Sequence, residues 1–261
     1  MKDYLKALFR IFLVLLAYFI SQALILTLFA AAGGAGAEGD IQSAMSRFLA
    51  QKASLISLLH NLLLIAVMLA FYFKKQSVRD MVAISPLPGR EYLWCALCAA
   101  AFSIAVSLLL TLLPIPDRLM SSYSDSVAAS SGGTFPERFI ATAVLAPVAE
   151  EMLFRGLIYG TLRSVLRRPA ALLLSCAIFG LMHGQLLWVI YAFLMGAVLT
   201  LIYDKYRTLL ASMAFHIAFN ITGSFILPAL SGGMSMLPLL LAMCLGLWYS
   251  VRHIRAYNTK G

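Results

Sequence analysis

Charged residues are scarce in this chain of 261 residues, where Asp, Glu, Lys and Arg together make up 12%. Soluble domains carry roughly 25% charged residues, so the composition excludes an ordinary soluble domain. Apolar residues make up 62%, and the mean hydropathy is +0.89. The net charge is +9, but the basic residues form short clusters between apolar runs, which argues against nucleic acid as a partner. We therefore expect a chain whose solvent is lipid.

Cysteine is also rare, and the placement of the four cysteines argues against a disulfide framework or a zinc ribbon. All four lie in apolar segments, where a free thiol behaves as a small hydrophobic group. Cys95 and Cys98 form a Cys-x-x-Cys pattern, but the surrounding sequence is not typical of a soluble redox domain. The sequence also contains no visible internal repeat and no separate soluble domain. One membrane domain, 1–261, is the simplest interpretation.

Eight apolar segments have about the length needed to cross roughly 30 Å of hydrocarbon at about 1.5 Å per residue. They cover approximately residues 5–32, 53–73, 91–113, 137–163, 170–184, 186–203, 208–227 and 235–251. The fifth segment is short. The first is too long for the apolar core of a signal peptide, so we expect it to be retained as a helix. The predicted fold class is all-α, a polytopic transmembrane bundle of about eight helices.

Lysine and arginine are concentrated in alternate predicted loops. Most lie at 2–10, 74–90, 163–168, 205–207 and 252–260, whereas the other loops hold Arg47, Lys52, Arg118 and Arg138. Because cytoplasmic loops carry the excess of basic residues, both termini are predicted to be cytoplasmic. The stretch 114–136, rich in Pro, Ser and Gly, then lies outside, and we interpret it as a connector. This pattern favours an integral, multi-pass protein of a bacterial plasma membrane.

Three ionisable residues, Glu150, Glu151 and Arg155, fall deep within a predicted span. Charges at that depth are costly and usually mark a functional site. Glu151 and Arg155 are four residues apart, hence on one helical face and in the favourable order for an ion pair. Glu150 is rotated by about 100° from Glu151 and is poorly placed for that pair, so it needs another reason to be there. Just upstream, Pro147 predicts a bend and a freed carbonyl.

Three further polar residues, His183, His216 and Asn220, occur at a similar depth on later predicted spans. Counting about 1.5 Å per residue from the nearest cytoplasmic basic residue, they and Glu150 lie roughly 14–22 Å deep. An unpaired buried polar atom costs about 1–3 kcal/mol, so these groups are best accommodated around one polar cavity. A carboxylate and an imidazole there can polarise a water molecule, and a second imidazole with an amide can stabilise an oxyanion. The remaining histidines are His60 and His253. They lie near helix ends or the basic tail, so they need no place in this polar cavity.

Three motifs occur in order on successive predicted helices: Glu-Glu-x-x-x-Arg at 150–155, Phe-x-x-x-His at 179–183 and His-x-x-x-Asn at 216–220. In these motifs, over roughly residues 137–225, the chain resembles the CAAX protease and bacteriocin-processing family of intramembrane glutamic endopeptidases, also called CPBP or Abi. The resemblance implies that one glutamate and one histidine activate water, while the second histidine and the asparagine stabilise the oxyanion. The implied catalytic residues are Glu150, His183, His216 and Asn220, with Glu151 and Arg155 in support.

The resemblance also predicts how the chain is organised and what it acts on. Residues 1–136 would hold the first three helices and the external loop, 137–225 the catalytic core, and 226–261 the last helix and the basic tail. The expected substrate is a membrane-associated peptide or protein, with membrane lipid as the other partner. No cofactor is expected.

Two alternatives stay open at this point. A divalent metal such as zinc could be bound by the glutamates and histidines, although no His-Glu-x-x-His pattern is present. The chain could also be a transporter or a partner-binding scaffold, for example in bacteriocin self-immunity, which uses the buried charges without proteolysis. No inverted repeat supports transport, and the complete set of motifs argues against an inactive relative.

Overall fold

The structure is a computed structural model that describes residues 2–35, 40–74, 83–230 and 236–257. Within these residues the chain is helical and contains no strand, so the predicted all-α class is confirmed. The uninterrupted helices are α1 (Lys2–Gly34), α2 (Ile41–Gln51), α3 (Ala53–Lys74), α5 (Gly89–Leu112), α6 (Asp117–Ser130), α10 (Arg168–Leu181), α11 (Leu186–Tyr206) and α14 (Met236–Ala256). Some predicted basic positions lie outside the described residues, namely Lys75, Arg79 and Lys260.

Two further helices contain π-helical turns, which are often found at functional sites. The first runs continuously through α7 (Phe135–Arg138), η1 (Phe139–Leu145), α8 (Ala146–Glu150), η2 (Glu151–Tyr159) and α9 (Gly160–Arg163). It begins with a capping box, in which the Thr134 hydroxyl accepts from the Glu137 N–H and the Glu137 carboxylate accepts from the Thr134 N–H. The second runs through α12 (Leu209–Ile221), η3 (Thr222–Ile226) and α13 (Leu227–Leu230).

Long apolar helices make this an integral, multi-pass membrane protein. Five helices of the described chain are long and apolar enough to cross a membrane, namely Lys2–Gly34, Ala53–Phe71, Gly89–Leu112, Leu186–Tyr206 and Leu209–Leu230. The shorter apolar helix α10 is the predicted short fifth segment. Many large apolar side chains on α1 are exposed, with Leu8 62% accessible, as expected for a surface that contacts lipid. Each of the eight apolar segments expected from the sequence coincides with a helix.

The predicted external connector at 114–136 was wrong in one respect, because it contains the helix α6. Pro116 is the N-cap residue of α6, and the helix ends at Ser130. Tyr123 packs edge-on against two aromatic rings of α11, with centroid distances of 6.4 Å to Trp188 and 6.3 Å to Tyr191. Most of the stability of a short polar helix comes from tertiary packing of this kind rather than from its own residues.

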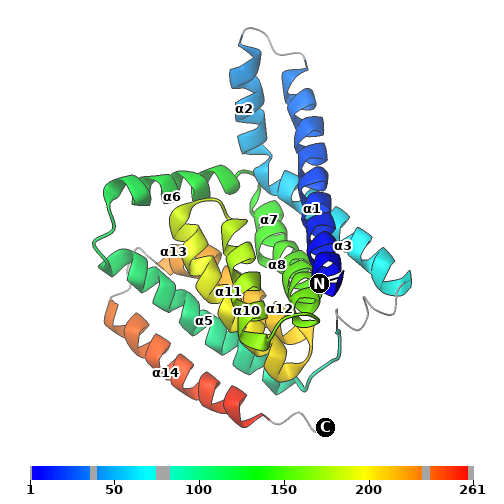
Figure 1. Cartoon of the computed structure of the whole chain (residues 1–261). Helices are drawn as coiled ribbons and strands as arrows, with labels where there is room; N and C mark the ends of the chain where they lie inside the picture. The colour runs from blue at the N-terminus through cyan, green and yellow to red at the C-terminus, as the bar shows by residue number, and fades with distance from the viewer. Residues whose placement is uncertain (1, 36–39, 75–82, 231–235, 258–261) are drawn as a thin grey trace.

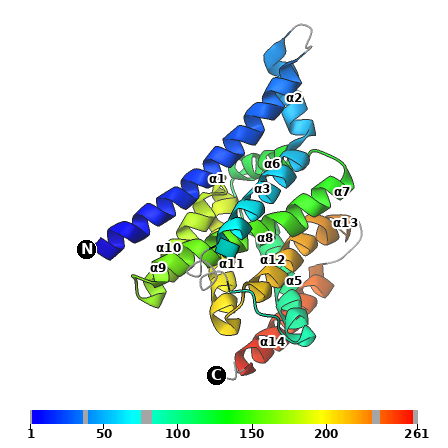
Figure 2. The ribbon, with the colours of Figure 1, turned by 90° about the vertical axis from the view of Figure 1, so that its right-hand side faces the viewer.

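The helix ends gather in two groups at opposite ends of the bundle. At one end, the Ser54 N–H donates to the Gly132 carbonyl oxygen at 2.9 Å, which joins the start of α3 to the segment after α6. At the other end, the Leu209 N–H donates to the Ala83 carbonyl oxygen at 2.8 Å, which joins α12 to the segment before α5. These contacts agree with the predicted alternation of the loops. In both views α1 and α2 project together beyond the other helices (Figures 1 and 2).

The helix that contains both glutamates lies inside the bundle. Its η2 part contacts α1, α3, α10, α11 and α12, while α5 packs along α12 and α14 on the far side. The helices α10 and α11 approach closely at Gly180, where an added Cβ would lie 2.8 Å from the Val189 carbonyl oxygen. The end of α10 also lies beside the glutamate helix, where the Phe179 ring packs edge-on against the Phe154 ring at a centroid distance of 4.9 Å.

Candidate functional site

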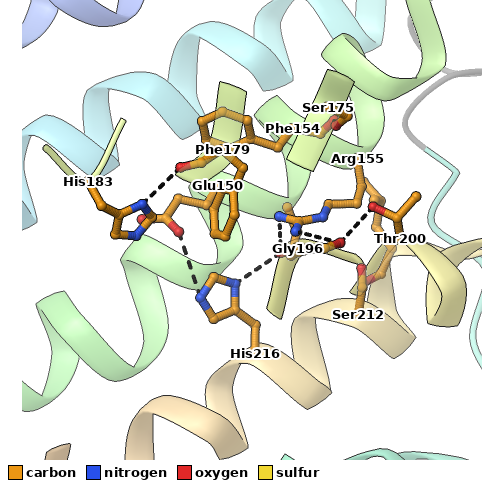
Figure 3. A network of polar contacts seen from close by, with 12 residues as sticks. Glu150, Phe154, Arg155, Ser175, Phe179, His183, Gly196, Thr200, Ser212 and His216 are labelled. Atoms are coloured by element: carbon orange, nitrogen blue, oxygen red, sulfur yellow. Dashed lines mark hydrogen bonds and ion pairs between the residues drawn. The ribbon is translucent and has the colours of Figure 1, made fainter. Parts of the chain in front are cut away.

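Glu151 and Arg155 form a buried ion pair within η2, as their spacing predicted. Arg155 Nη1 donates to Glu151 Oε1 at 2.9 Å, and the two side chains are 1% and 0% exposed. Arg155 Nη2 also donates to the Gly196 carbonyl oxygen of α11 at 3.2 Å, and its guanidinium lies 4.3 Å from the ring centroid of Phe179. A carbonyl and an aromatic face thus surround the cation and compensate part of its desolvation (Figure 3).

His216 lies between the two glutamates, a contact that helical spacing within one segment could not predict. Its Nδ1 lies 2.9 Å from Glu151 Oε1, and its Nε2 lies 3.7 Å from Glu150 Oε2. An ionised carboxylate can only accept a hydrogen bond, so Nδ1 is the donor and Nε2 is the atom that faces Glu150 (Figure 3). Glu151 therefore orients the ring of His216 as well as pairing with Arg155.

His183 lies in the turn after α10, so the prediction that it lies within a span was wrong. Gly184 has a φ of +72°, and this left-handed conformation lets the chain turn from α10 into α11. His183 Nδ1 lies 2.9 Å from the Phe179 carbonyl oxygen, which can only accept, so the proton is on Nδ1 and the lone pair of the neutral ring is on Nε2. The Phe179 ring packs edge-on against His183 and His216, with centroid distances of 5.0 and 6.1 Å. Phe179 thus positions both imidazoles.

Asn220 of α12 is bonded to the helix that contains the glutamates. Its Nδ2 donates to the Thr142 carbonyl oxygen at 2.8 Å. In η1 the Ala146 N–H bonds to the Ala141 carbonyl, five residues back, so the next pair in this register would join residue 147 to Thr142. Pro147 has no N–H, and Asn220 supplies the missing donor. The carbonyl freed by the proline is therefore present, and an amide from another helix satisfies it.

The four residues predicted to be catalytic line one cavity of about 410 Å³: Glu150, His183, His216 and Asn220. This volume is within the range of pockets that bind small-molecule ligands. The Glu150 side chain is 26% exposed, whereas Glu151 is fully buried, so the two glutamates differ as helical rotation predicted. The convergence expected from depth is observed, while the catalytic role of each residue stays a prediction.

A second cavity, of about 430 Å³, also reaches Glu150 from the side of α1, α2 and α3. His60 lines it and is 6% exposed, with its Nε2 3.0 Å from Ser21 Oγ of α1. The expectation that His60 lies near a helix end was wrong, because His60 lies well inside α3. Its position seven residues into an apolar segment was the available signal.

Glu91 is a second buried polar residue that sequence reasoning missed. It is 0% exposed and accepts hydrogen bonds from the Tyr206 hydroxyl and Arg90 Nε, both at 2.9 Å. His253 Nε2 lies 3.4 Å from Glu91 Oε1, and the His253 ring stacks on Trp94. Glu91 is in the first turn of α5, and side chains of α11 and α14 cover it there.

In the part of the chain that the structure describes, no group of three or more His, Cys, Asp or Glu side chains is arranged to hold a metal ion. Glu151 is already engaged by Arg155 and His216.

Known proteins are similar to this chain over the segment that contains the site. Residues 133–222 match the family described as type II CAAX prenyl endopeptidase Rce1-like. The family resemblance inferred from the three motifs is thus confirmed over this segment, which contains all six predicted site residues. The match supports proteolysis of the CAAX-protease type in general.

Two relatives come from Lactococcus lactis subsp. lactis (strain IL1403). The chain is 28% identical over 142 residues to the UPF0177 protein YxdF, an alignment that covers 52% of this chain and 78% of the relative. It is 33% identical over 90 residues to the UPF0177 protein YaiF, covering 33% of this chain and 38% of that relative. No solved structure matches the chain significantly.

Proposed function

We propose that this protein is an intramembrane glutamic endopeptidase that hydrolyses a peptide bond in a membrane-associated peptide or protein. The observation that carries the proposal is the convergence of Glu150, His183 and His216 with Asn220 on one cavity inside a helical membrane bundle. The match of residues 133–222 to a family of prenyl endopeptidases supports it. The basic loops, and relatives from a bacterium, support a location in a bacterial plasma membrane.

In the proposed reaction, Glu150 and the Nε2 lone pair of His183 hold the attacking water. Glu150 removes a proton as the water oxygen adds to the carbonyl carbon of the substrate. That proton then passes to the leaving nitrogen, the C–N bond breaks, and a carboxylic acid and an amine are released. No cofactor takes part in these steps.

The oxyanion of the tetrahedral intermediate would be stabilised by His216 and Asn220. Glu151 accepts from Nδ1 of His216 and so turns Nε2 towards the cavity, where an Nε2–H of the doubly protonated ring would donate to the oxyanion. Asn220 uses one amide hydrogen on the Thr142 carbonyl and has a second one to donate. Both groups would act from positions that other helices hold rigidly.

The proposal is tested by comparing membranes that contain the wild-type protein, Glu150→Gln or His183→Ala. We expect each substitution to lower cleavage at least about 100-fold, because general acid–base catalysis contributes that much or more. Quantitative peptidomics of the membrane fractions measures the products, and thermal unfolding in detergent shows that the variants fold. Asp125→Asn, at an exposed position, is the matched control.

Two outcomes would count against the mechanism or the function. If the Glu150→Gln variant cleaved its substrate at the normal rate, the proposed mechanism would be wrong. The absence of any product from the wild-type protein would favour a transporter or a partner-binding scaffold. Elemental analysis of the purified protein, with activity measured in the presence of a chelator, decides between the metal-free and metal-dependent alternatives.

A further inference from the structure

The cavity at the candidate site extends towards only one end of the bundle. The helices α3 and α5 contribute their residues nearest that end, such as Ser57 and Leu110, and α6 contributes Val127 and Ser130. This is the end of the bundle at which α6 lies, and the connection between α11 and α12 lies at the opposite end (Figure 1). It is also the end that contains few lysines and arginines, so the positive-inside rule places the mouth of the cavity on the extracytoplasmic face.

Arg138 lies at the mouth of the cavity. Among the described residues that line the cavity, Arg138 is the only Lys or Arg, and Glu150 is the only Asp or Glu. Arg138 Nε is buried, and within the described residues it has no hydrogen-bond partner. A guanidinium that faces a cavity without an anionic partner is suited to bind a carboxylate, with which it forms paired hydrogen bonds.

The spacing between Arg138 and Glu150 sets a length for the bound peptide. The two residues are twelve positions apart on one continuous helix, hence separated by at most roughly 18 Å along its axis. An extended peptide spans about 3.3–3.6 Å per residue, so about five residues fit between the two side chains.

We propose that Arg138 binds a carboxylate of the substrate, about five residues from the bond that is cut, and that the peptide enters from the extracytoplasmic face. This inference rests on the proposed peptidase function and deepens it by naming the substrate class, an exported or membrane-anchored peptide with a carboxylate at that distance. The carboxylate is either the C-terminus of the peptide or an Asp or Glu side chain.

A binding experiment tests the carboxylate site. Fluorescent peptide pools are prepared with a free C-terminal carboxylate or a C-terminal amide, with and without acidic side chains, and their binding to the purified full-length protein is measured by anisotropy. The neutral pool is the one that has a C-terminal amide and no acidic side chain. We expect pools that carry the recognised carboxylate to bind at least about 10-fold more tightly than the neutral pool, and Arg138→Gln to abolish this difference. Arg118→Gln, an exposed arginine on the same face outside the cavity, should leave it unchanged.

The two sources of the carboxylate give different results in this experiment. If the free C-terminus is the ligand, amidated peptides bind no more tightly than the neutral pool. If an Asp or Glu side chain is the ligand, amidated peptides that contain these residues still bind more tightly. Equal binding of all pools by the wild-type protein, or a preference that survives in Arg138→Gln, would overturn the carboxylate site. Mass spectrometry of cleaved peptides adds a separate measurement, since Arg138→Gln should raise KM at least 10-fold with kcat unchanged.

Cysteine labelling tests the side of entry independently of activity. In a background with the exposed Cys244 replaced by alanine, Ser130→Cys at the mouth should react with a membrane-impermeant maleimide in intact cells. Ser164→Cys, exposed at the opposite end, should react only after permeabilisation. The reverse pattern would overturn extracytoplasmic entry.

The carboxylate site and the peptidase function can fail separately. If the protein binds acidic peptides through Arg138 but cuts none, the peptidase function is refuted and the carboxylate site is retained. If it cuts acidic and neutral peptides equally well, the carboxylate site is refuted and the peptidase function is retained.

Discussion

The adjacent residues Glu150 and Glu151 have different surroundings because an α-helix rotates about 100° per residue. Glu151 is fully buried, and its Oε1 accepts from both Arg155 and His216. Glu150 is partly exposed to the cavity, where it contacts His216 at the longer distance of 3.7 Å. Substitutions at the two positions should therefore separate stability from chemistry.

We expect Glu151→Ala to lower the free energy of unfolding by about 3–5 kcal/mol, because it leaves Arg155 buried and uncompensated. Glu150→Ala should change it by about 1 kcal/mol or less, since that side chain is partly exposed and its contact with His216, at 3.7 Å, is longer than a hydrogen bond. Denaturant unfolding of the purified variants in detergent measures both values. Similar losses at the two positions would show that the glutamates are equivalent structural residues.

At the level of the elements, the helix from 135 to 163 depends on a neighbouring helix for one of its main-chain bonds. Pro147 interrupts the π-helical bonding of η1, and the Thr142 carbonyl is satisfied by Asn220 of α12. This bond also fixes the distance between the glutamates and the residues on α12. An asparagine expected only to stabilise an oxyanion thus has a structural bond as well.

We expect Asn220→Ala to lower the free energy of unfolding by about 1–3 kcal/mol, because it leaves a buried carbonyl unsatisfied. In a Pro147→Ala background the loss should be smaller by at least about 0.5 kcal/mol, since residue 147 then provides its own N–H. A double-mutant cycle measures this coupling. Asn61→Ala is the control, because the Asn61 amide bonds within its own helix, to Ser57. Purely additive effects of Asn220→Ala and Pro147→Ala would contradict the proposed compensation.

At the scale of the whole molecule, polar contacts tie together the helix ends away from α6. Glu91 of α5 accepts from Tyr206 of α11 and lies near His253 of α14. Arg168 of α10 pairs with Asp204 of α11 in the same part of the bundle. The proposed site lies towards the opposite end, so this cluster should stabilise the bundle without taking part in catalysis.

Glu91→Ala should therefore lower the free energy of unfolding by about 2 kcal/mol or more, because Tyr206 and Arg90 lose a charged acceptor. We also expect faster trypsin cleavage in α14, at Arg252 or Arg255, as this helix loosens. Peptide binding at the cavity should change less than 2-fold. Asp125→Ala, on the exposed surface of α6, serves as the control and should affect none of these measurements.

Much of the fold was predictable because hydropathy and helical periodicity are local properties of the chain. The apolar segments predicted the long helices, and the four-residue spacing of Glu151 and Arg155 predicted their ion pair. The helix α6 was not predictable, because its polar residues form a helix only when Tyr123 packs against α11. The turn at His183 was missed as well, since apolar composition continues past the end of α10.

By itself, the sequence determined that this protein lies in a membrane, where its long apolar helices run and which polar residues lie at similar depths. These properties follow from the cost of placing charged groups in hydrocarbon and from the rise of a helix per residue. Only the tertiary structure decided that His216 lies between two glutamates, that Asn220 bonds to Thr142 and that Arg138 lines the same cavity as Glu150. Those contacts join helices far apart in the chain, and helix packing alone sets their geometry.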